Sequence, residues 1–301
     1  MMFRFNIFNH CEDGRRCIED LTTIMSAQLR DLGHEAVSAN DGYITGEAGI
    51  NVLYESFADE GTISTIAAAY ADGARFLYIA TEEPTAAGCF NGRLDNAMDA
   101  RMAVFPEAAR YAEGILHLPP GSEVTEWYSR YAPAAYAEIG HASSLVHENG
   151  PDDVVPLHTF GFYGQMTPRR ERIFGRLARV SGYEVVVLPF ITHSSTERDV
   201  AMRSVRVILQ VRAHDSMPIV SSSRCATALH LGRPVVGEPH AAPGPWGKIV
   251  HLSSTLDDFY NDAILASAEW SELHLRQLKQ FAATLPPEVC LGDPLRRIGI
   301  L

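Results

Sequence analysis

Short apolar segments that alternate with amphipathic helical segments constrain the fold of this chain more than any other feature. Several strand-like segments, such as 50–55 and 75–80, are apolar at consecutive positions rather than at every second position. Strands that are apolar on both faces belong to parallel sheets covered by helices on both sides. The alternation therefore predicts an α/β fold in which the carboxyl ends of the strands share one edge, where ligands bind.

The alternation runs twice along the chain. Strands are expected at 3–8, 35–38, 50–55, 75–80 and 114–118, and again at 160–163, 183–188, 207–211, 234–238 and 248–252. Helices are expected at 16–32, 63–70, 94–102, 168–180, 222–231 and 256–285, with a short one after Ser195. Residues 119–156 are less regular, and the polar residues 148–153 are typical of a linker.

We therefore expect two Rossmann-like parallel-sheet domains that face a cleft, formed by residues 1–150 and 151–301. A chain of 301 residues is long enough for two domains, each with its own core. The second domain is expected to end with the long amphipathic helix at 256–285.

Charge is distributed unevenly between the two halves. Residues 1–150 carry 22 acidic residues against 9 arginines and no lysine, whereas residues 151–301 carry 15 acidic residues against 16 basic ones. An acidic first half argues against nucleic acid or an anionic membrane as a partner there. The second half holds the arginines that an anionic ligand needs. The excess of acidic residues in the first half is explained equally well by a role in keeping the protein in solution.

Bulk composition is that of an ordinary globular protein. The chain is 46% hydrophobic and 21% charged. No apolar run approaches the roughly 18 residues of a membrane span, and the first residues lack the pattern of a signal peptide. The five cysteines are odd in number and scattered, which argues against a disulfide framework and favours a reducing cytoplasm.

The stretch 157–238 carries the residues best suited to a phosphate-bearing ligand. Tyr163 and Gly164 end an expected strand, and a glycine there lets the backbone approach a phosphate closely. The helix that follows aims free N–H groups at an anion, and Arg169 and Arg170 can add charge-assisted hydrogen bonds. A strand, a turn and a helix with solvated arginines is the plainer interpretation.

A second group of candidates follows later in the same stretch. Ser222, Ser223 and Arg224 begin an expected helix, where they either cap it or hold a diphosphate. Glu238 ends an apolar strand, so its carboxylate can accept both hydroxyls of a ribose; a loop carboxylate is the alternative. His214 follows another strand and is expected to face the same edge.

The order of these signals resembles the donor-binding half of GT-B glycosyltransferases, closest to the bacterial spore-maturation type. The shared pattern is a strand that ends in Tyr-Gly, an Arg-Arg helix, the helix start Glu197-Arg198-Asp199, an Ile-Leu-Gln-Val strand, and an arginine-led helix that runs into Gly-Arg-Pro-Val-Val-Gly-Glu. The resemblance implies that residues 151–301 bind a nucleotide-sugar and residues 1–150 the acceptor. One departure is Ser221, where those relatives commonly carry an acidic residue.

Candidates for the catalytic base lie in the first half. His10 follows the first strand, and an unperturbed imidazole suits general base catalysis on a hydroxyl. Glu82 and Glu83 end the fourth strand and can take the same role, and Glu55 ends the third. An exposed loop histidine is the plainer interpretation of His10, and the residues alone do not rank the four.

The leading hypothesis is metal-independent sugar transfer from a nucleotide-sugar to an unidentified hydroxyl acceptor. No Asp-x-Asp lies near a strand end and no His, Asp or Glu cluster has ligand spacing. We expect neither a metal nor a cofactor beyond the nucleotide-sugar, with the leaving diphosphate held by a helix dipole and arginine. A GT-B-shaped protein that binds a nucleotide or a partner without turnover is the alternative, and Ser221 motivates it. A sugar epimerase is a third possibility. A dinucleotide enzyme is disfavoured because no GxGxxG follows the first strand.

Overall fold

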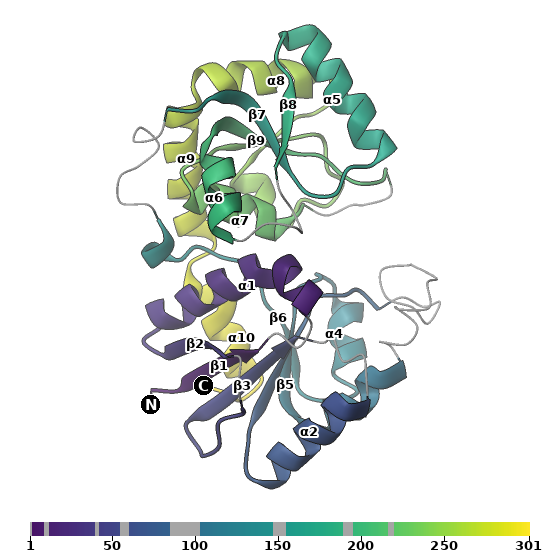
Figure 1. Cartoon of the computed structure of the whole chain (residues 1–301), viewed down its shortest axis with the longest axis vertical. Helices are drawn as coiled ribbons and strands as arrows, with labels where there is room; N and C mark the ends of the chain where they lie inside the picture. The colour runs from purple at the N-terminus through teal and green to yellow at the C-terminus, as the bar shows by residue number, and fades with distance from the viewer. Residues whose placement is uncertain are drawn as a thin grey trace. The chain divides into compact units, whose positions relative to one another are not determined.

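The contacts within the chain divide it into two units, each built on its own sheet (Figure 1). The computed structural model describes residues 2–8, 12–39, 42–54, 60–84, 103–146, 155–188, 195–215 and 220–301. Unit 1 comprises residues 1–18, 25–139 and 287–301, and unit 2 comprises residues 19–24 and 140–286. The last residues of the chain thus return to the first sheet.

Unit 1 is built on a six-stranded parallel sheet in the order β2-β1-β3-β4-β5-β6. Every residue of β3 and β4 is buried, because helices cover both faces of a parallel sheet. The expected doubly covered sheet is confirmed. Its strands are β1 (Arg4–Phe8), β2 (Glu35–Ala39), β3 (Gly49–Tyr54), β4 (Phe76–Ala80), β5 (Ala112–His117) and β6 (Ala134–Tyr136).

The helices of unit 1 come from both ends of the chain. They include α1 (Glu12–Asp31), of which residues 19–24 belong to unit 2, α2 (Glu60–Ala71), α4 (Ser122–Tyr128) and, near the carboxyl terminus, α10 (Asp293–Arg297). The terminal segment packs tightly on the sheet: a Cβ at Gly114 in β5 would lie 2.7 Å from Cδ1 of Ile298. The glycine therefore makes room for the returning tail.

Unit 2 is built on a five-stranded parallel sheet in the order β11-β10-β9-β7-β8. Its strands are β7 (His158–Tyr163), β8 (Val185–Leu188), β9 (Val205–Gln210), β10 (Val235–Gly237) and β11 (His251–Leu252). Its helices are α5 (Pro168–Ser181), α6 (Ser195–Arg203), α7 (Ser222–His230), α8 (Leu256–Ala268) and α9 (Trp270–Thr284), with a 3₁₀ turn, η4 (Gly244–Lys248).

Alternation along the strands of unit 2 places two sets of helices on opposite faces. Phe160, Phe162, Val207 and Leu209 point to one face, where they share a core with residues of α5 and α8. The other face packs against α6 and α7. Helix α9 is bonded to β10 through the side-chain amide of Gln277. This amide accepts from the backbone N–H of Val235 and donates to the backbone carbonyl of Val235, each at 2.8 Å.

The structure differs from the expected elements in several places, among them a helix, α4, in the segment expected to be irregular and a strand, β11, shorter than the expected 248–252. The helix expected at 256–285 is two helices, because the chain leaves helical geometry at Glu269, with φ −112° and ψ 27°. The break lets Trp270 lie under the guanidinium of Arg233, 4.8 Å from the ring centre. Strand β6 lies in the segment expected to be irregular. The expected helix at 94–102 and linker at 148–153 fall outside the described residues.

Within the described ranges, no helix combines the length and the apolar character needed to cross a membrane.

Candidate functional site

The candidate site lies in unit 2, where β7, β9 and β10 end side by side. The strands pair in register, with Gly161 of β7 beside Ile208 of β9 and Gly237 of β10 beside Gln210. Because the sheet is parallel, the residues that follow the three strands meet at one edge. Those residues include Gly164, Arg212 and Glu238, as the sequence predicts for the first and the last.

Glu238 is the most completely bonded side chain at this edge. Its carboxylate is only 1% exposed. Oε1 accepts from Nη1 of Arg169 at 2.7 Å and from the backbone N–H of Arg212 at 2.6 Å. Oε2 accepts from Nη2 of Arg169 and, at 3.4 Å, from Nη2 of Arg212. Burial alone would raise the pKa of Glu238, but these hydrogen bonds and the charge of Arg169 outweigh it and lower the pKa.

Arg169 is likewise committed to carboxylates. Its Nε donates to Oδ1 of the exposed Asp215 at 2.5 Å, and its Nη1 also donates to the carbonyl of Arg212 at 3.1 Å. The hydrogen bonds that Arg169 donates to Glu238 are the main cause that raises the pKa of Arg169. Of the five N–H groups of this guanidinium, four are therefore in use.

Arg170 and Arg224 differ from Arg169, since neither forms an ion pair within the part of the chain that the structure describes. Both are buried, 6% and 7% exposed. Their guanidinium carbons lie 4.6 and 4.8 Å from the centre of the same ring, that of Phe162. Burial, followed by the charge of Arg170, lowers the pKa of Arg224 to about 10. Two buried cations on one aromatic ring without a counter-ion favour an anionic ligand.

Neutral acceptors fix the orientation of these two arginines. Arg224 donates from Nε to the carbonyl of Tyr163 and from Nη1 to Oε1 of Gln210. Arg170 donates from Nε to the carbonyl of Val211 at 2.9 Å. No described residue accepts a hydrogen bond from Nη2 of Arg224, so this group can donate to a ligand.

Gly164 gives Arg224 its space. A Cβ at this position would lie 2.7 Å from Nη2 of Arg224, and φ at Gly164 is +146°. A side chain would be both strained and in the way of the guanidinium. The sequence prediction that the Tyr163 corner and the Arg224 helix form one site is consistent with this contact.

Helix α7 presents its amino terminus at the same edge. Its N-cap residue, Ser221, makes no side-chain capping bond, so the first N–H groups of the helix keep their donor capacity. Ser223 is half-buried. The hydroxyl of Ser222 accepts from Nε1 of Trp246 at 3.0 Å, and Trp246 is buried. The proline-rich loop before Trp246 is thus tied to α7.

The remaining sequence-predicted candidates belong to other segments of the chain. His214 is exposed on the loop after β9. Glu82 and Glu83 follow β4 in unit 1, and the carbonyl of Glu82 accepts from the hydroxyl of Tyr128 at 2.7 Å. His10 and Glu55 fall outside the described residues.

Three residues of the site were missed by the sequence reasoning: Phe162, Gln210 and Arg212. Phe162 reads as a core residue, and only the arginines stacked on it show its second role. Of the three, only Gln210 has a feature in the sequence that could have marked it as a site residue, because it is a polar residue at the end of an apolar strand.

In the described ranges, no three His, Cys, Asp or Glu side chains gather closely enough to hold a metal ion.

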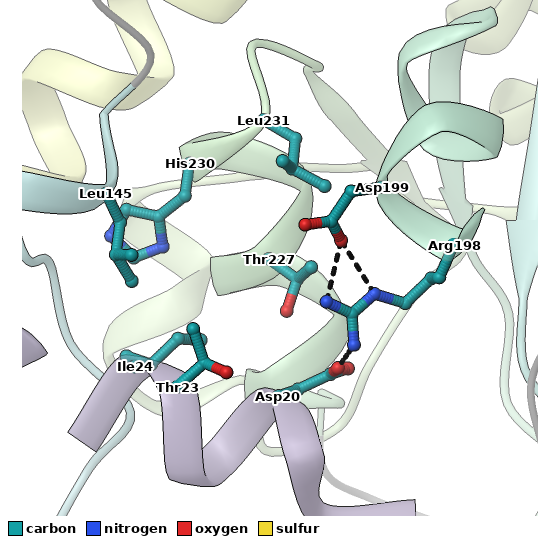
Figure 2. Close-up of a pocket in the computed structure, with 9 residues that line it drawn as sticks. All are labelled: Asp20, Thr23, Ile24, Leu145, Arg198, Asp199, Thr227, His230 and Leu231. Atoms are coloured by element: carbon teal, nitrogen blue, oxygen red, sulfur yellow. Dashed lines mark hydrogen bonds and ion pairs between the residues drawn. The ribbon is translucent and has the colours of Figure 1, made fainter. Parts of the chain in front are cut away.

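A small pocket also lies in unit 2, between α1, α6 and α7 (Figure 2). Its volume is about 50 Å³. Arg198 pairs there with Asp20 and Asp199, and Thr227 and His230 of α7 line the opposite side. A space of this size holds water rather than a nucleotide.

The chain thus consists of two α/β units on parallel sheets, and unit 2 has a cluster of buried arginines at the carboxyl edge of its strands. Known structures identify the fold. No protein-family model matches the chain, and no curated protein sequence does. Among solved structures, an alpha-glucosyltransferase in complex with UDP and a 13-mer DNA containing an HMU base matches with a TM-score of 0.63 and 9% identity, over 99% of this chain and 100% of that one.

Two further solved structures have the same fold. AviGT4, a glycosyltransferase involved in avilamycin A biosynthesis, matches with a TM-score of 0.56 and 12% identity, over 98% of this chain and 97% of that one. A TarM mutant from S. aureus in complex with fondaparinux, alpha-GlcNAc-glycerol and UDP matches with a TM-score of 0.53 and 10% identity. That match covers 84% of this chain but 55% of TarM. The expected GT-B fold is therefore confirmed. At these identities the likeness shows the fold alone, and the narrower spore-maturation type stays a prediction.

Proposed function

We propose that the protein transfers a sugar from a nucleotide-sugar to a hydroxyl-bearing acceptor. The observation that carries the proposal is the pair of buried guanidinium groups of Arg170 and Arg224, which form no ion pair with a described residue, beside the uncapped amino terminus of α7. An anion with the charge of a diphosphate can pair directly with both groups. Of the three solved structures compared above, one is an alpha-glucosyltransferase and one a glycosyltransferase, and two contain UDP.

The chemistry follows from this charge distribution. In sugar transfer, the bond between the anomeric carbon and the diphosphate oxygen breaks, a bond to the acceptor oxygen forms, and the acceptor proton passes to a base. Negative charge grows on the leaving diphosphate, where Arg170, Arg224 and the N–H groups of α7 stabilise it. These fixed cations perform the task for which other transferases use a divalent metal, so the proposal includes metal independence. His10, Glu82 and Glu83 stay the predicted bases.

The experiment is a binding and turnover series on the purified protein. UDP-, GDP- and TDP-sugars are screened by thermal shift, because a ligand that binds the folded state raises its melting temperature. The best donor is then incubated with and without EDTA, and release of the nucleoside diphosphate is measured. Binding with metal-insensitive release supports the proposal. Binding without release or transfer supports the alternative, a GT-B-shaped binding protein. No binding of any nucleotide refutes both.

A further inference from the structure

Glu238 has no acceptor capacity left for a ribose. A carboxylate offers about four lone-pair positions, and four donors already occupy those of Glu238: Nη1 and Nη2 of Arg169, and the backbone N–H and Nη2 of Arg212. With the side chain 1% exposed, a ribose diol would have to replace bonds from charged guanidinium groups with bonds from neutral hydroxyls. Such an exchange is unfavourable, since it breaks the bidentate pair between Arg169 and the carboxylate.

One of those four bonds connects Glu238 to the anion site. The peptide unit between Val211 and Arg212 uses both of its polar groups there. Its N–H donates to Oε1 of Glu238 at 2.6 Å, and its carbonyl accepts from Nε of Arg170 at 2.9 Å. The carboxylate thus fixes and polarises the peptide that orients the Arg170 guanidinium on Phe162.

A second connection runs through the backbone of α5. Glu238 holds Arg169 by a bidentate pair, and Arg169 precedes Arg170 in the first turn of that helix. The side chain of Thr167, the N-cap, accepts from the N–H of Arg170 at 3.4 Å. Glu238 therefore restrains Arg170 from both sides, through its backbone neighbour and through the acceptor of its Nε.

From these contacts we infer that Glu238 is a positioning residue for the phosphate-binding arginines and does not bind the ribose of the donor. The inference rests on the proposed function, since it assumes that the anion is the diphosphate of a nucleotide-sugar. It replaces the sequence-based role of Glu238 as a ribose acceptor. The inference also concerns the class of donor. The site recognises the diphosphate, so a donor that lacks the ribose hydroxyls makes the same contacts near Glu238 as one that has them.

The first test uses the wild-type protein and two matched ligand pairs. Affinities are measured by calorimetry for UDP and 2′,3′-dideoxy-UDP, and for GDP and 2′,3′-dideoxy-GDP, with inorganic pyrophosphate as a ligand without a nucleoside. We expect the two members of a pair to bind within about threefold of each other, because the acceptors of Glu238 are already occupied. A loss of about 30-fold or more in the dideoxy compound, the penalty for a lost hydrogen bond to a charged group, overturns the inference.

The second test removes the charge of Glu238. In Glu238→Gln the amide cannot accept at both positions, so Arg170 loses the restraints that pass through Arg169 and the Val211–Arg212 peptide and keeps only its bond from Nη1 to the carbonyl of Gln165. We expect affinity to fall about tenfold or more, and by the same factor for UDP, dideoxy-UDP and pyrophosphate. The matched control is Glu184→Gln, an exposed carboxylate just before β8, which should leave all three affinities unchanged. A loss confined to the ribose-bearing ligand contradicts the positioning role.

A third readout does not depend on any ligand. The Nε–H signal of Arg170, assigned with Arg170→Lys, is followed by ¹H–¹⁵N NMR in wild type, Glu238→Gln and Glu184→Gln. We expect it to shift and exchange faster with water only in Glu238→Gln. An unchanged signal overturns the inference, even if no nucleotide binds and the proposed function itself fails. If Glu238→Gln does not fold, the dideoxy comparison on the wild type still decides the ribose question.

Discussion

Arg170 and Arg224 come from different helices, yet they lie on the same ring and neither has a carboxylate partner among the described residues. Their neighbour Arg169, by contrast, is paired with two carboxylates. The two adjacent arginines thus have different roles: Arg169 holds the structure together through its ion pairs, and Arg170 forms no ion pair with a described residue, so its charge is available to an anionic ligand. This difference separates the residues that should affect binding from those that should affect stability.

Substitution of Arg224 by alanine should weaken binding of the nucleotide-sugar strongly. The change removes a buried charge and the Nη2 donors, for which no described residue is an acceptor, and hydrogen bonds between charged groups contribute about 1.5–3 kcal/mol. We expect the dissociation constant to rise roughly 10- to 100-fold in calorimetry. The control is Arg179→Ala, an exposed arginine in the last turn of α5, which should bind normally. Equal affinities of Arg224→Ala and wild type would reject the site.

Substitution of Phe162 by leucine should reduce binding without removing any polar group. The ring supports both guanidinium groups, and each cation–π contact contributes about 0.5–2 kcal/mol. We expect an affinity loss of roughly 5- to 50-fold for the nucleoside diphosphate, measured by calorimetry.

Phe174→Leu is the matched control for Phe162→Leu. The two rings lie 5.0 Å apart in one core, so both variants should lose a similar amount of stability, on the order of 1 kcal/mol. Only Phe162 contacts the arginines. If both variants lose affinity equally, the effect comes from core packing and the ring has no special role.

Part of this site follows from the sequence, and the rest depends on long-range pairing. The apolar runs of β7, β9 and β10 predict where the strands end, and the parallel sheet then places Tyr163, Gly164 and Glu238 at one edge. The partner of Glu238 is not predictable in this way, since Arg169 lies 69 positions earlier and any of several arginines could have reached it. A strand-end carboxylate therefore suggested a ribose ligand, whereas the fold had already committed it to Arg169 and Arg212.

The same limit applies to the break between α8 and α9. Neither glycine nor proline marks Glu269, and the helical periodicity continues through it. What favours the break is a tertiary contact, the stacking of Trp270 on Arg233. Strand β6 was missed for a related reason, because three residues in an aromatic-rich segment carry no periodicity of their own.

Substitution of Gly164 by alanine should damage the anion site more than the fold. The new Cβ would lie 2.7 Å from Nη2 of Arg224 and would force the guanidinium to move. We expect a loss of affinity of about tenfold or more and a decrease in the free energy of unfolding of roughly 1–3 kcal/mol from the strained backbone.

Gly182→Ala separates strain from crowding. Gly182 also has a positive φ, +75°, but a Cβ there would meet nothing within 4 Å. This variant should be destabilised to a similar extent in urea denaturation and should bind normally. Normal binding by Gly164→Ala as well would mean that the Arg224 guanidinium tolerates displacement, contrary to its proposed role.

Buried His230 should make the protein less stable in acid. Burial, then the charge of His141, lowers its pKa to about 3, and its Nε2 accepts from the N–H of Ala142 at 3.0 Å, a bond that requires the neutral ring. In the unfolded chain the imidazole titrates near 6.5. Between those values the unfolded state binds a proton that the folded state does not. The free energy of unfolding therefore falls as pH falls through this window, by up to about 1.4 kcal/mol per pH unit.

The measurement is urea denaturation from pH 7 to pH 4, followed by tryptophan fluorescence, on wild type and His230→Gln. Glutamine can accept from the N–H of Ala142 but does not titrate, so its stability should depend less steeply on pH. His158→Gln removes an exposed histidine and should keep the wild-type slope, because the buried ring of His230 stays in place. If the free energy of unfolding of His230→Gln depends on pH as steeply as that of the wild type, His230 is not the origin of the acid sensitivity.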